Sequence, residues 1–206
     1  MIQIVGNDGK RPPAEAMRAM FEARKGVFVD LLKWEVPVLA GRFEIDQFDD
    51  EHATYLILQD EEGNHLGSVR LLETVRPHLL DTLFAPLCAA PPPRGLHVRE
   101  ITRFCLDRRL PARDRRQVRD RLVRALVDHG LARGIATYTG VAEMGWLNQI
   151  LHFGWECRPL GLPRTMGGRM LGALSISITA ETPALLAANG IHAPTPRQVI
   201  HARRAA

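Results

Sequence analysis

Arg24 interrupts the apolar face of the first predicted helix, and it constrains this chain more than any other residue. Apolar side chains recur at three- and four-residue spacing from Ala14 to about Trp34, which predicts one long amphipathic helix. Arg24 falls in the middle of its apolar face. A guanidinium stays charged at any ordinary pH, so its burial costs several kcal/mol unless carboxylates meet it. The fold must therefore bring acidic side chains to Arg24.

The segment 43–51, Phe-Glu-Ile-Asp-Gln-Phe-Asp-Asp-Glu, offers those partners. It holds five carboxylates, interleaved with Phe43, Ile45 and Phe48, which favour burial. An arginine on a buried face, followed by a half-buried acidic cluster, is typical of a charged active site. A structural ion pair without function is an equally good interpretation of Arg24 alone.

Further charges lie inside predicted strands. Arg70 stands in the apolar run 65–73, and Glu100 and Arg103 stand in the run 96–106. In an ideal strand Glu100 and Arg103 point to opposite faces, whereas a β-bulge would bring them together beside a cleft. The alternative is that one of them simply faces solvent. Taken together, the charged residues make a network that can hold a zwitterion: Arg24, Arg70 and Arg103 with Glu44, Asp46, Asp49 and Glu100.

The order of predicted elements favours a mixed α/β fold. Antiparallel strands come first and strand–helix–strand units follow, which implies a mixed sheet with helices on both faces. The long segment 76–95 contains several prolines and is predicted to be a loop with one helical turn at 78–83. Strands are predicted at 53–59, 65–73, 96–106, 135–142, 155–160 and 170–179, and helices at 14–34, 112–133, 144–153 and 182–188.

Composition limits the class of protein. A chain of 206 residues that is 46% hydrophobic suits one domain, expected over 1–192, with a loose tail over 193–206. No apolar run approaches 18 residues and no signal peptide is visible, so we expect a cytoplasmic protein without a membrane partner. The three cysteines and the scattered histidines have no metal-ligand spacing, so we expect no metal. His65, His78 and His97 are expected at the surface or in loops.

The ordered charged and aromatic positions resemble the acyl-homoserine lactone synthases, the LuxI-type autoinducer synthases. The resemblance covers roughly residues 1–175 and is most specific between Arg24 and Arg103. It implies a GNAT-like acyltransferase fold, an α/β/α sandwich. It also implies a reaction in which S-adenosyl-L-methionine takes an acyl group from acyl carrier protein and closes to a lactone, releasing methylthioadenosine. S-adenosylmethionine is a substrate here, so no cofactor is expected.

The same resemblance suggests a role for each site residue. Glu100 is expected to be the general base that accepts the amine proton, with Arg103 beside it as a second catalytic residue. Glu44 is expected to belong to a structural charge network. The sulfonium needs aromatic faces and the carboxylate and ammonium need charges of both signs, so the residues expected to bind S-adenosylmethionine are Arg24, Phe28, Trp34, Asp46, Asp49 and Arg70.

The acyl donor is constrained by a missing motif. CoA-dependent GNAT enzymes usually bind pyrophosphate with a glycine-rich loop, whereas the corresponding segment 108–117 has no glycine. This favours acyl carrier protein over acyl-CoA. The docking residues would be arginines of the following helix, although these can equally be a solvated helix face: Arg113, Arg115, Arg116 and Arg124. Trp146 and Ile150 lie on an apolar helix face that is either plain core or part of an acyl pocket.

Two other functions are compatible with parts of the sequence. One is a GNAT-type N-acyltransferase that uses acyl-CoA and a different amine. The other is a basic regulator that binds nucleic acid through the arginines of the helix 112–133. Asp114 and Asp120 interrupt that basic helix, which argues against nucleic acid as a partner.

Overall fold

The computed structural model describes residues 2–6 and 13–192, which divide into two compact units. The first unit holds the residues up to Arg70 together with Arg103–Ala125, and the second holds Leu71–Thr102 and the residues from Leu126 onward. Two strands, β5 (His65–Glu73) and β6 (Val98–Leu106), contribute residues to both units.

The first unit is built on the strand order β1-β4-β5-β6. β1 (Ile2–Val5) pairs antiparallel with β4 (Thr54–Gln59). A tight turn then leads into β5, because the Asp60 carboxylate accepts hydrogen bonds from the backbone and side chain of Asn64 and Gly63 adopts a φ of 83°. A short hairpin of β2 (Val38–Leu39) and β3 (Phe43–Glu44) lies outside this sheet.

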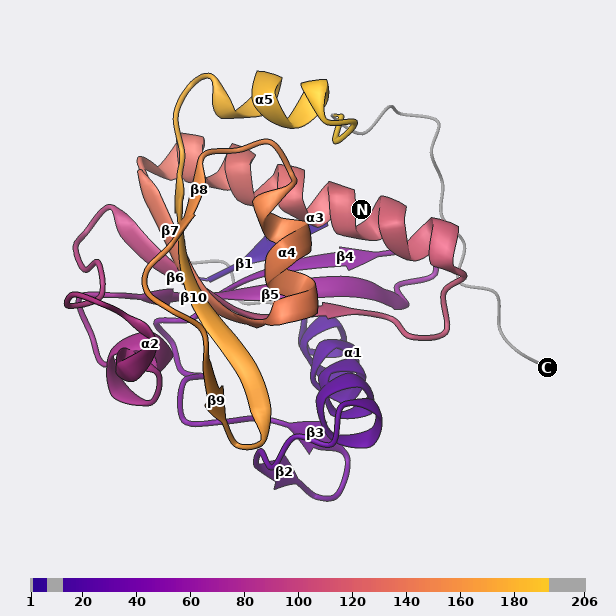
Figure 1. The fold of residues 1–206 in the computed structure, drawn as a ribbon. Coiled ribbons are helices and arrows are strands. Elements are labelled where there is room, and N and C mark those ends of the chain that lie inside the picture. Colours follow the sequence, from indigo (N-terminus) through magenta and orange to yellow (C-terminus); the bar gives the residue numbers. More distant parts are fainter. Residues whose placement is uncertain (1, 7–12, 193–206) are drawn as a thin grey trace. The chain divides into compact units, whose positions relative to one another are not determined.

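Helices cover both faces of β4 in the first unit (Figure 1). Tyr55 and Leu58 are three residues apart on this strand, so their side chains point to opposite faces. Tyr55 meets the ring of Phe21 on α1 (Ala14–Arg24) edge to face, at a centroid distance of 6.3 Å. Leu58 belongs to a buried cluster with Val118 of α3 (Ala112–Arg133). The strand therefore lies between two helical layers.

The helix α1 does not continue as an α-helix to Trp34. From Lys25 to Leu31 it becomes a π-helix, and the chain turns shortly afterwards, where the Trp34 amide donates to the Phe28 carbonyl at 2.8 Å. Arg24 is the last α-helical residue. Short π-helical stretches occur frequently at functional sites.

The second unit has the strand order β6-β7-β10-β8, with β9 also paired to β10. β7 (Thr137–Glu143) runs parallel to β6, and β10 (Arg169–Ser177) runs antiparallel to β7, to β8 (Cys157–Pro159) and to β9 (Arg164–Met166). The sheet is thus mixed, as the order of predicted elements indicated.

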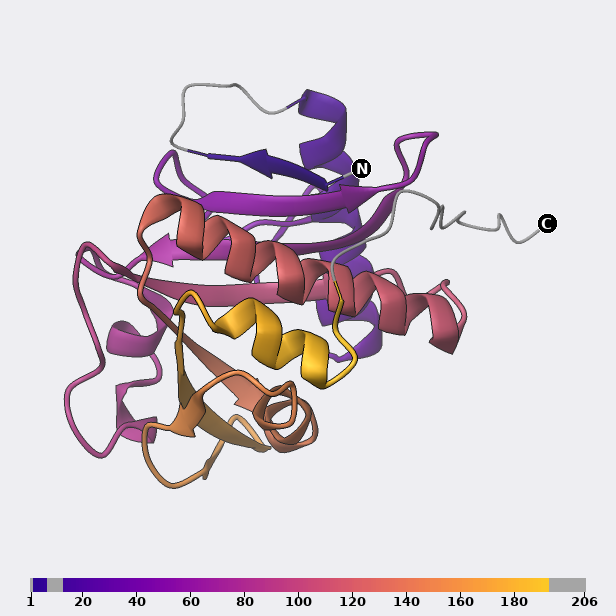
Figure 2. The same ribbon diagram turned by 90° about the horizontal axis from the view of Figure 1, so that it is seen from above.

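The two faces of the second sheet carry different helices (Figure 2). On one face the Tyr138 hydroxyl donates to the Leu126 carbonyl of α3, and α4 (Met144–Leu151) approaches Gly172 through Leu147. On the other face Ala173 packs in an apolar cluster with residues of α2 (Leu79–Thr82) and of a 3₁₀ helix, Ala85–Leu87. The last described helix is α5 (Thr182–Ala188).

Most predicted elements are confirmed, with several differences. The first helix ends earlier than predicted, and β1, β2, β3, β9 and the 3₁₀ helix were not predicted. His65 and His78 were expected at the surface or in loops, but both are buried. The prediction is wrong because the spacing of histidines along the chain does not show which residues pack around them. The expected tail 193–206 lies outside the described residues. No helix in the described ranges is long and apolar enough to cross a membrane.

Gly67 of β5 allows α3 to approach the strand closely. A Cβ at this position would lie 2.7 Å from Val118 Cγ1, 2.9 Å from Leu122 Cδ1 and 3.1 Å from the Cys105 carbonyl oxygen. Those contacts are shorter than van der Waals distances, so even one methyl group requires the side chains of Val118 and Leu122, or the helix that carries them, to shift.

We therefore expect Gly67→Ala to lower the free energy of unfolding by about 1–3 kcal/mol, as overpacked cores do. Gly26→Ala is the matched control, because nothing lies within 4 Å of a Cβ built there and the residue is helical. Urea denaturation of both variants measures the difference. A Gly67 variant as stable as the Gly26 variant would contradict the close approach of α3.

Candidate functional site

Arg24 is met by two carboxylates of the acidic segment, as the sequence predicts. Its Nε donates to Glu44 Oε2 at 2.5 Å, and its Nη1 and Nη2 donate to Asp49 Oδ1 and Oδ2 at 2.7 and 2.8 Å. The side chain of Arg24 is 1% exposed, and those of Glu44 and Asp49 are 0% exposed. This buried cation is therefore fully paired at both ends of its guanidinium.

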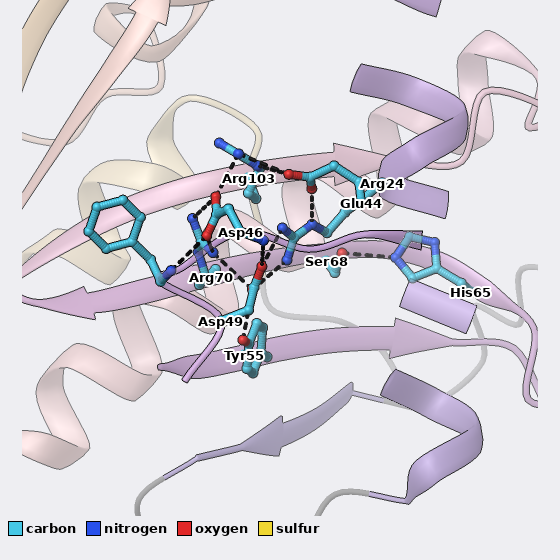
Figure 3. Close-up of polar contacts among 10 residues, drawn as sticks. Arg24, Glu44, Asp46, Asp49, Tyr55, His65, Ser68, Arg70 and Arg103 are labelled. Atoms are coloured by element: carbon cyan, nitrogen blue, oxygen red, sulfur yellow. Dashed lines mark hydrogen bonds and ion pairs between the residues drawn. The ribbon is translucent and has the colours of Figure 1, made fainter. Parts of the chain in front are cut away.

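Arg70 and Arg103 extend these pairs into a closed ring (Figure 3). Arg70 donates to both oxygens of Asp46, at 2.6 and 3.1 Å, and its Nη1 lies 2.8 Å from Asp49 Oδ1. Arg103 donates through Nε and Nη2 to Glu44 Oε1 at 3.0 and 2.9 Å, and through Nη2 to Asp46 Oδ2 at 2.7 Å. We call this set of alternating charges the charge ring, and its order is Arg24, Glu44, Arg103, Asp46, Arg70, Asp49 and back to Arg24.

Each carboxylate of the charge ring is shared by two arginines, and this sharing sets the protonation states. Burial alone would raise the pKa of Asp49, but the hydrogen bond from Arg24 and the charges of Arg70 and Arg24 outweigh it and hold that pKa well below its usual range. Burial alone would lower the pKa of Arg24, but Asp49 and Glu44 raise it above its ordinary value. Arg24 and Asp49 are therefore both ionised near neutral pH.

Tyr55 is a ring partner that sequence reasoning missed. Its hydroxyl donates to Asp49 Oδ1 at 2.8 Å. Burial, followed by the charge of Asp49, raises the pKa of Tyr55, so this hydroxyl keeps its proton. The signal in the sequence was one tyrosine in the otherwise aliphatic run Tyr-Leu-Ile-Leu, which begins four residues after the last residue of the acidic segment. Backbone amides of Asp46 and Phe48 also donate to Asp49 and Asp46, both at 2.9 Å.

Phe28 and Trp34 lie against Arg103. The two rings stack at a centroid distance of 4.7 Å and an interplanar angle of 23°. The guanidinium carbon of Arg103 lies 5.6 Å from the Phe28 centroid and 5.9 Å from the Trp34 centroid, within the range of a cation–π interaction. The aromatic faces expected to shield a ligand cation thus cover a cation of the protein itself.

The backbone of Arg103 is strained. Its φ is 51°, a left-handed conformation that non-glycine residues adopt at a cost of about 1–3 kcal/mol. This conformation departs from the extended backbone of a strand, and the alternation of buried residues along β6 changes at this point. A β-bulge between Glu100 and Arg103 stays a prediction. Backbone strain of this kind persists only where the surrounding contacts hold the residue in place, and it clusters at functional sites.

Glu100 belongs to the second unit and is also buried, with 1% exposed. It lies opposite Thr139 of β7, and Thr139 lies opposite Ser175 of β10, so these three polar side chains share one face of the sheet. Burial raises the pKa of the Cys88 thiol, and the charge of Glu100 adds to the effect.

An apolar cluster lies on the same face as Glu100. Its members Val141 and Ala173 are opposite each other in the β7–β10 register, two residues along from Thr139 and Ser175. Sequence reasoning did not find this cluster, because its residues come from strands and from the loop of several prolines. We call it the apolar cluster; it consists of Leu80, Phe84, Leu87, Cys88, Val141, Leu160, Met166, Leu171 and Ala173.

Trp146 and Ile150 lie elsewhere in the second unit. Both are on α4, which packs through Leu147 onto the face of Gly172, opposite the face of Glu100. Ile150 is buried, and Trp146 meets the Phe153 ring edge to face at 5.7 Å. These contacts are those of core residues, and an acyl-binding role for them stays a prediction.

The four arginines expected to dock a carrier protein lie on the half of α3 that belongs to the first unit. Arg113 and Arg116 are exposed, whereas Arg115 and Arg124 are half-buried. Arg115 donates to the Arg108 carbonyl at 3.3 Å. Two of the four are thus well placed for a partner of opposite charge.

The ionised state of Asp49 makes stability depend on pH. Its pKa is lower in the folded chain than in the unfolded chain, so its stabilising effect is complete above about pH 4 and is lost as the pH falls further. We expect Asp49→Asn to lower the free energy of unfolding by about 3–5 kcal/mol at pH 7, since it leaves buried arginines short of a counter-charge. We also expect the loss to shrink toward pH 3.

Urea denaturation at pH 7 and pH 3 measures both effects. Asp50→Asn, at an exposed neighbouring position, is the matched control and should cost less than about 1 kcal/mol. Equal effects of the two substitutions at pH 7 would show that the charge ring does not stabilise the fold.

Comparison with known proteins identifies the family. The family model described as autoinducer synthase matches residues 11–183. An acyl-homoserine-lactone synthase of Ralstonia nicotianae is 34% identical over 195 residues, which cover 92% of this chain and 95% of that protein.

Solved structures support the same relationship. BjaI, described as a CoA-dependent acyl-homoserine lactone synthase and solved with SAM and isopentyl-CoA, has a TM-score of 0.81 at 27% identity, covering 92% of this chain and 89% of its own. TofI, solved in a ternary complex with an inhibitor and MTA, has a TM-score of 0.76 at 29% identity, covering 91% and 96%. The expected mixed α/β, GNAT-like acyltransferase fold is confirmed. The chain belongs to the autoinducer synthase family.

Proposed function

We propose that the protein is an acyl-homoserine lactone synthase, an acyltransferase that makes a quorum-sensing signal from S-adenosyl-L-methionine and an acyl thioester. The observation that carries the proposal is the charge ring, which joins four residues expected to bind S-adenosylmethionine to Arg103 and Glu44 in a chain of this family. The four are Arg24, Asp46, Asp49 and Arg70. Such a ring occupies a buried position that an ordinary core would fill with apolar side chains.

The reaction has two bond-forming steps. In the first, the neutral amine nitrogen of S-adenosylmethionine attacks the thioester carbon, the carbon–sulfur bond breaks, and sulfur leaves as a thiolate, which receives the proton lost by the amine and becomes a thiol. A base takes the proton that the amine loses. In the second, a carboxylate oxygen of the same molecule attacks its γ-carbon. The bond to the sulfonium breaks, its electron pair stays on sulfur, and neutral methylthioadenosine leaves.

Glu100 is the proposed base. Its buried carboxylate shares a sheet face with the apolar cluster, so a base and an apolar lining occur together on one unit. A thioester with an apolar chain needs that combination, because the chain is desolvated while the amine beside it must lose a proton. We propose that the acyl chain lies against the apolar cluster.

The proposed donor is acyl carrier protein. The segment 108–117 has no glycine to cradle a pyrophosphate, and Arg113 and Arg116 within it are exposed. Acyl-CoA is the second candidate, because the solved relative BjaI is described as CoA-dependent. The two donors differ in charge and size, so kinetics can separate them.

A product assay tests the proposal as a whole. The purified protein is incubated with S-adenosylmethionine and either acyl carrier protein or CoA thioesters of several chain lengths, and products are identified by mass spectrometry. We expect acyl-homoserine lactone and methylthioadenosine in equal amounts. An acylated amine without methylthioadenosine would instead indicate a GNAT-type N-acyltransferase with another amine substrate.

Glu100→Gln tests the base. Glutamine keeps the shape of glutamate and much of its hydrogen bonding but is a far weaker base, so the acylation rate should fall on the order of 10²-fold or more while the fold survives. Single-turnover measurements are needed, because a later step otherwise hides the effect. Glu143→Gln, on the same face at a half-exposed position of β7, is the matched control. Full single-turnover activity would remove Glu100 from the mechanism.

Charge reversal on α3 tests the donor. We expect Arg113→Glu with Arg116→Glu to raise KM for acyl carrier protein several-fold, and added salt to weaken the wild type similarly, because both reduce the same attraction. The KM for S-adenosylmethionine should barely change. Arg133→Glu, at the far end of α3, is the matched control. Saturation by acyl-CoA with indifference to carrier protein would contradict this docking role.

A further inference from the structure

Hydrogen bonds join the two ends of the long segment between β5 and β6. Thr74 lies directly after β5, and its hydroxyl accepts a hydrogen bond from the Gly95 amide at 3.1 Å. The same hydroxyl lies 3.1 and 3.2 Å from the Val98 and Gly95 carbonyl oxygens, either of which can accept its proton. Arg94 donates to the Thr74 carbonyl at 2.9 Å and to the Val75 carbonyl at 3.3 Å. The beginning and the end of this segment are therefore fixed to each other.

The same hydrogen bonds reach α2 in the middle of the segment. One oxygen of the Asp81 carboxylate accepts a hydrogen bond from the His78 amide at 2.8 Å, and the other lies 3.4 Å from Arg94 Nη1. The His78 side chain is fully buried, and its Nδ1 lies 2.9 Å from the Arg76 carbonyl oxygen. We call this set of residues the loop network; it consists of Thr74, His78, Asp81 and Arg94.

The imidazole of His78 is held through its Nδ1 atom. The Arg76 carbonyl oxygen can only accept a hydrogen bond, so Nδ1 carries a proton and donates it. Asp81 Oδ1 is also close to Nδ1, at 3.3 Å. The other ring nitrogen, Nε2, is buried and has no partner among the described residues. The contacts that orient this side chain therefore all belong to the loop network and to the Arg76 carbonyl.

One side of the apolar cluster comes from the same segment. Four of its members lie between His78 and Ala89, and the others come from β7, β9, β10 and Leu160. The Ala89 amide donates to the Leu160 carbonyl at 2.8 Å, which fixes the later end of this stretch. The loop network fixes its earlier end at α2. We call these four members the loop side of the apolar cluster: Leu80, Phe84, Leu87 and Cys88.

The loop network also contacts the strand that carries the proposed base. The Thr74 hydroxyl lies 3.1 Å from the carbonyl oxygen of Val98, two residues before Glu100 on β6. Thr74 and His78 are both 0% exposed, so neither can leave its position without opening the packing around it. The loop side of the apolar cluster is therefore fixed relative to the strand of Glu100. A shift of α2 would alter the packing of an acyl chain between the two sides of the cluster.

We propose that the loop network positions the loop side of the apolar cluster, and that His78 thereby sets how well long acyl chains bind. This inference rests on the proposed function, in which the acyl chain lies against the apolar cluster. His78 is a positioning residue, because it acts through Leu80 and the residues that follow. Each methylene group removed from water strengthens binding about fourfold, so a displaced loop side costs most for the donor with the longest chain.

The test measures steady-state kinetics with acyl thioesters of increasing chain length. His78→Leu keeps a buried side chain but removes the hydrogen-bond donor. We expect it to lower kcat/KM roughly tenfold for the longest donor that the wild type uses, which corresponds to the loss of one to two methylene contacts. For the shortest donor the loss should be less than about threefold. The KM for S-adenosylmethionine should not change, whereas a general loss of structure would affect both substrates and all chain lengths.

His78→Asn tests the hydrogen bond itself. The amide nitrogen of asparagine can donate to the Arg76 carbonyl, and asparagine is favoured at the position directly before a helix, which His78 occupies. This variant should keep the wild-type dependence on chain length. His152→Leu is the matched control in the same unit, because His152 Nδ1 also lies close to a backbone carbonyl oxygen, that of Asn148 at 2.6 Å, but the residue is exposed. It should leave the kinetics unchanged.

Arg94→Met gives the answer if His78→Leu does not fold. The Arg94 side chain is 51% exposed, so its replacement leaves no cavity in the core. It removes the hydrogen bonds to the Thr74 and Val75 carbonyls and the ion pair with Asp81. We expect the same selective loss for long acyl chains.

The outcomes separate this inference from the proposed function. In the variant that folds, no loss, or an equal loss for all chain lengths, would overturn the positioning role and leave the function standing. A His78→Asn variant as selectively impaired as His78→Leu would overturn it as well, because the hydrogen bond to Arg76 would then be irrelevant. A wild type that forms no acyl-homoserine lactone from any donor would contradict the proposed function itself, and this inference with it.

Discussion

The charge ring is the constraint on which the first unit depends. Burying a cluster of charged side chains is unfavourable unless each charge has partners of opposite sign, and here each carboxylate is shared by two arginines. The ring ties the end of α1 to the acidic segment and to strands β5 and β6, segments that are distant in sequence. Tyr55 and two backbone amides satisfy further oxygens. Removing any one member would leave its neighbours as uncompensated charges, so the ring acts as a unit.

The sequence left two interpretations of Arg24 open, a structural ion pair and an active-site residue. In the charge ring, the structural interpretation fits Arg24 and its two partners, and the active-site interpretation fits Arg103. Arg24, Glu44 and Asp49 are closed to solvent, so their direct effect is on folding. Arg103 lies at the open side, with strained backbone and an aromatic cover. The rigid interior of the ring holds the Arg103 guanidinium in one orientation. A donor that the fold has already oriented loses little entropy when it binds a small charged substrate.

The second unit has a different chemistry. Its sheet places Glu100, Thr139 and Ser175 in a polar row, and the apolar cluster begins two residues along the same face. Strand register decides this arrangement, because paired residues share a face and a shift of one residue would exchange it for the opposite one. A charged ring in one unit and a base beside an apolar lining in the other correspond to the two substrates of the proposed reaction, one highly charged and one with an apolar acyl chain.

The sequence by itself determined the class of fold, most elements, and the need of Arg24 for carboxylates, since periodicity and the cost of a buried charge are local properties. It also named every member of the charge ring, and the family. It could not show that the ring closes, that Phe28 and Trp34 cover Arg103, or that Tyr55 joins in. Nor could it show the face that Glu100 shares with the apolar cluster. Those features depend on register, on a left-handed residue inside a strand and on contacts between distant segments, so only the tertiary structure decided them.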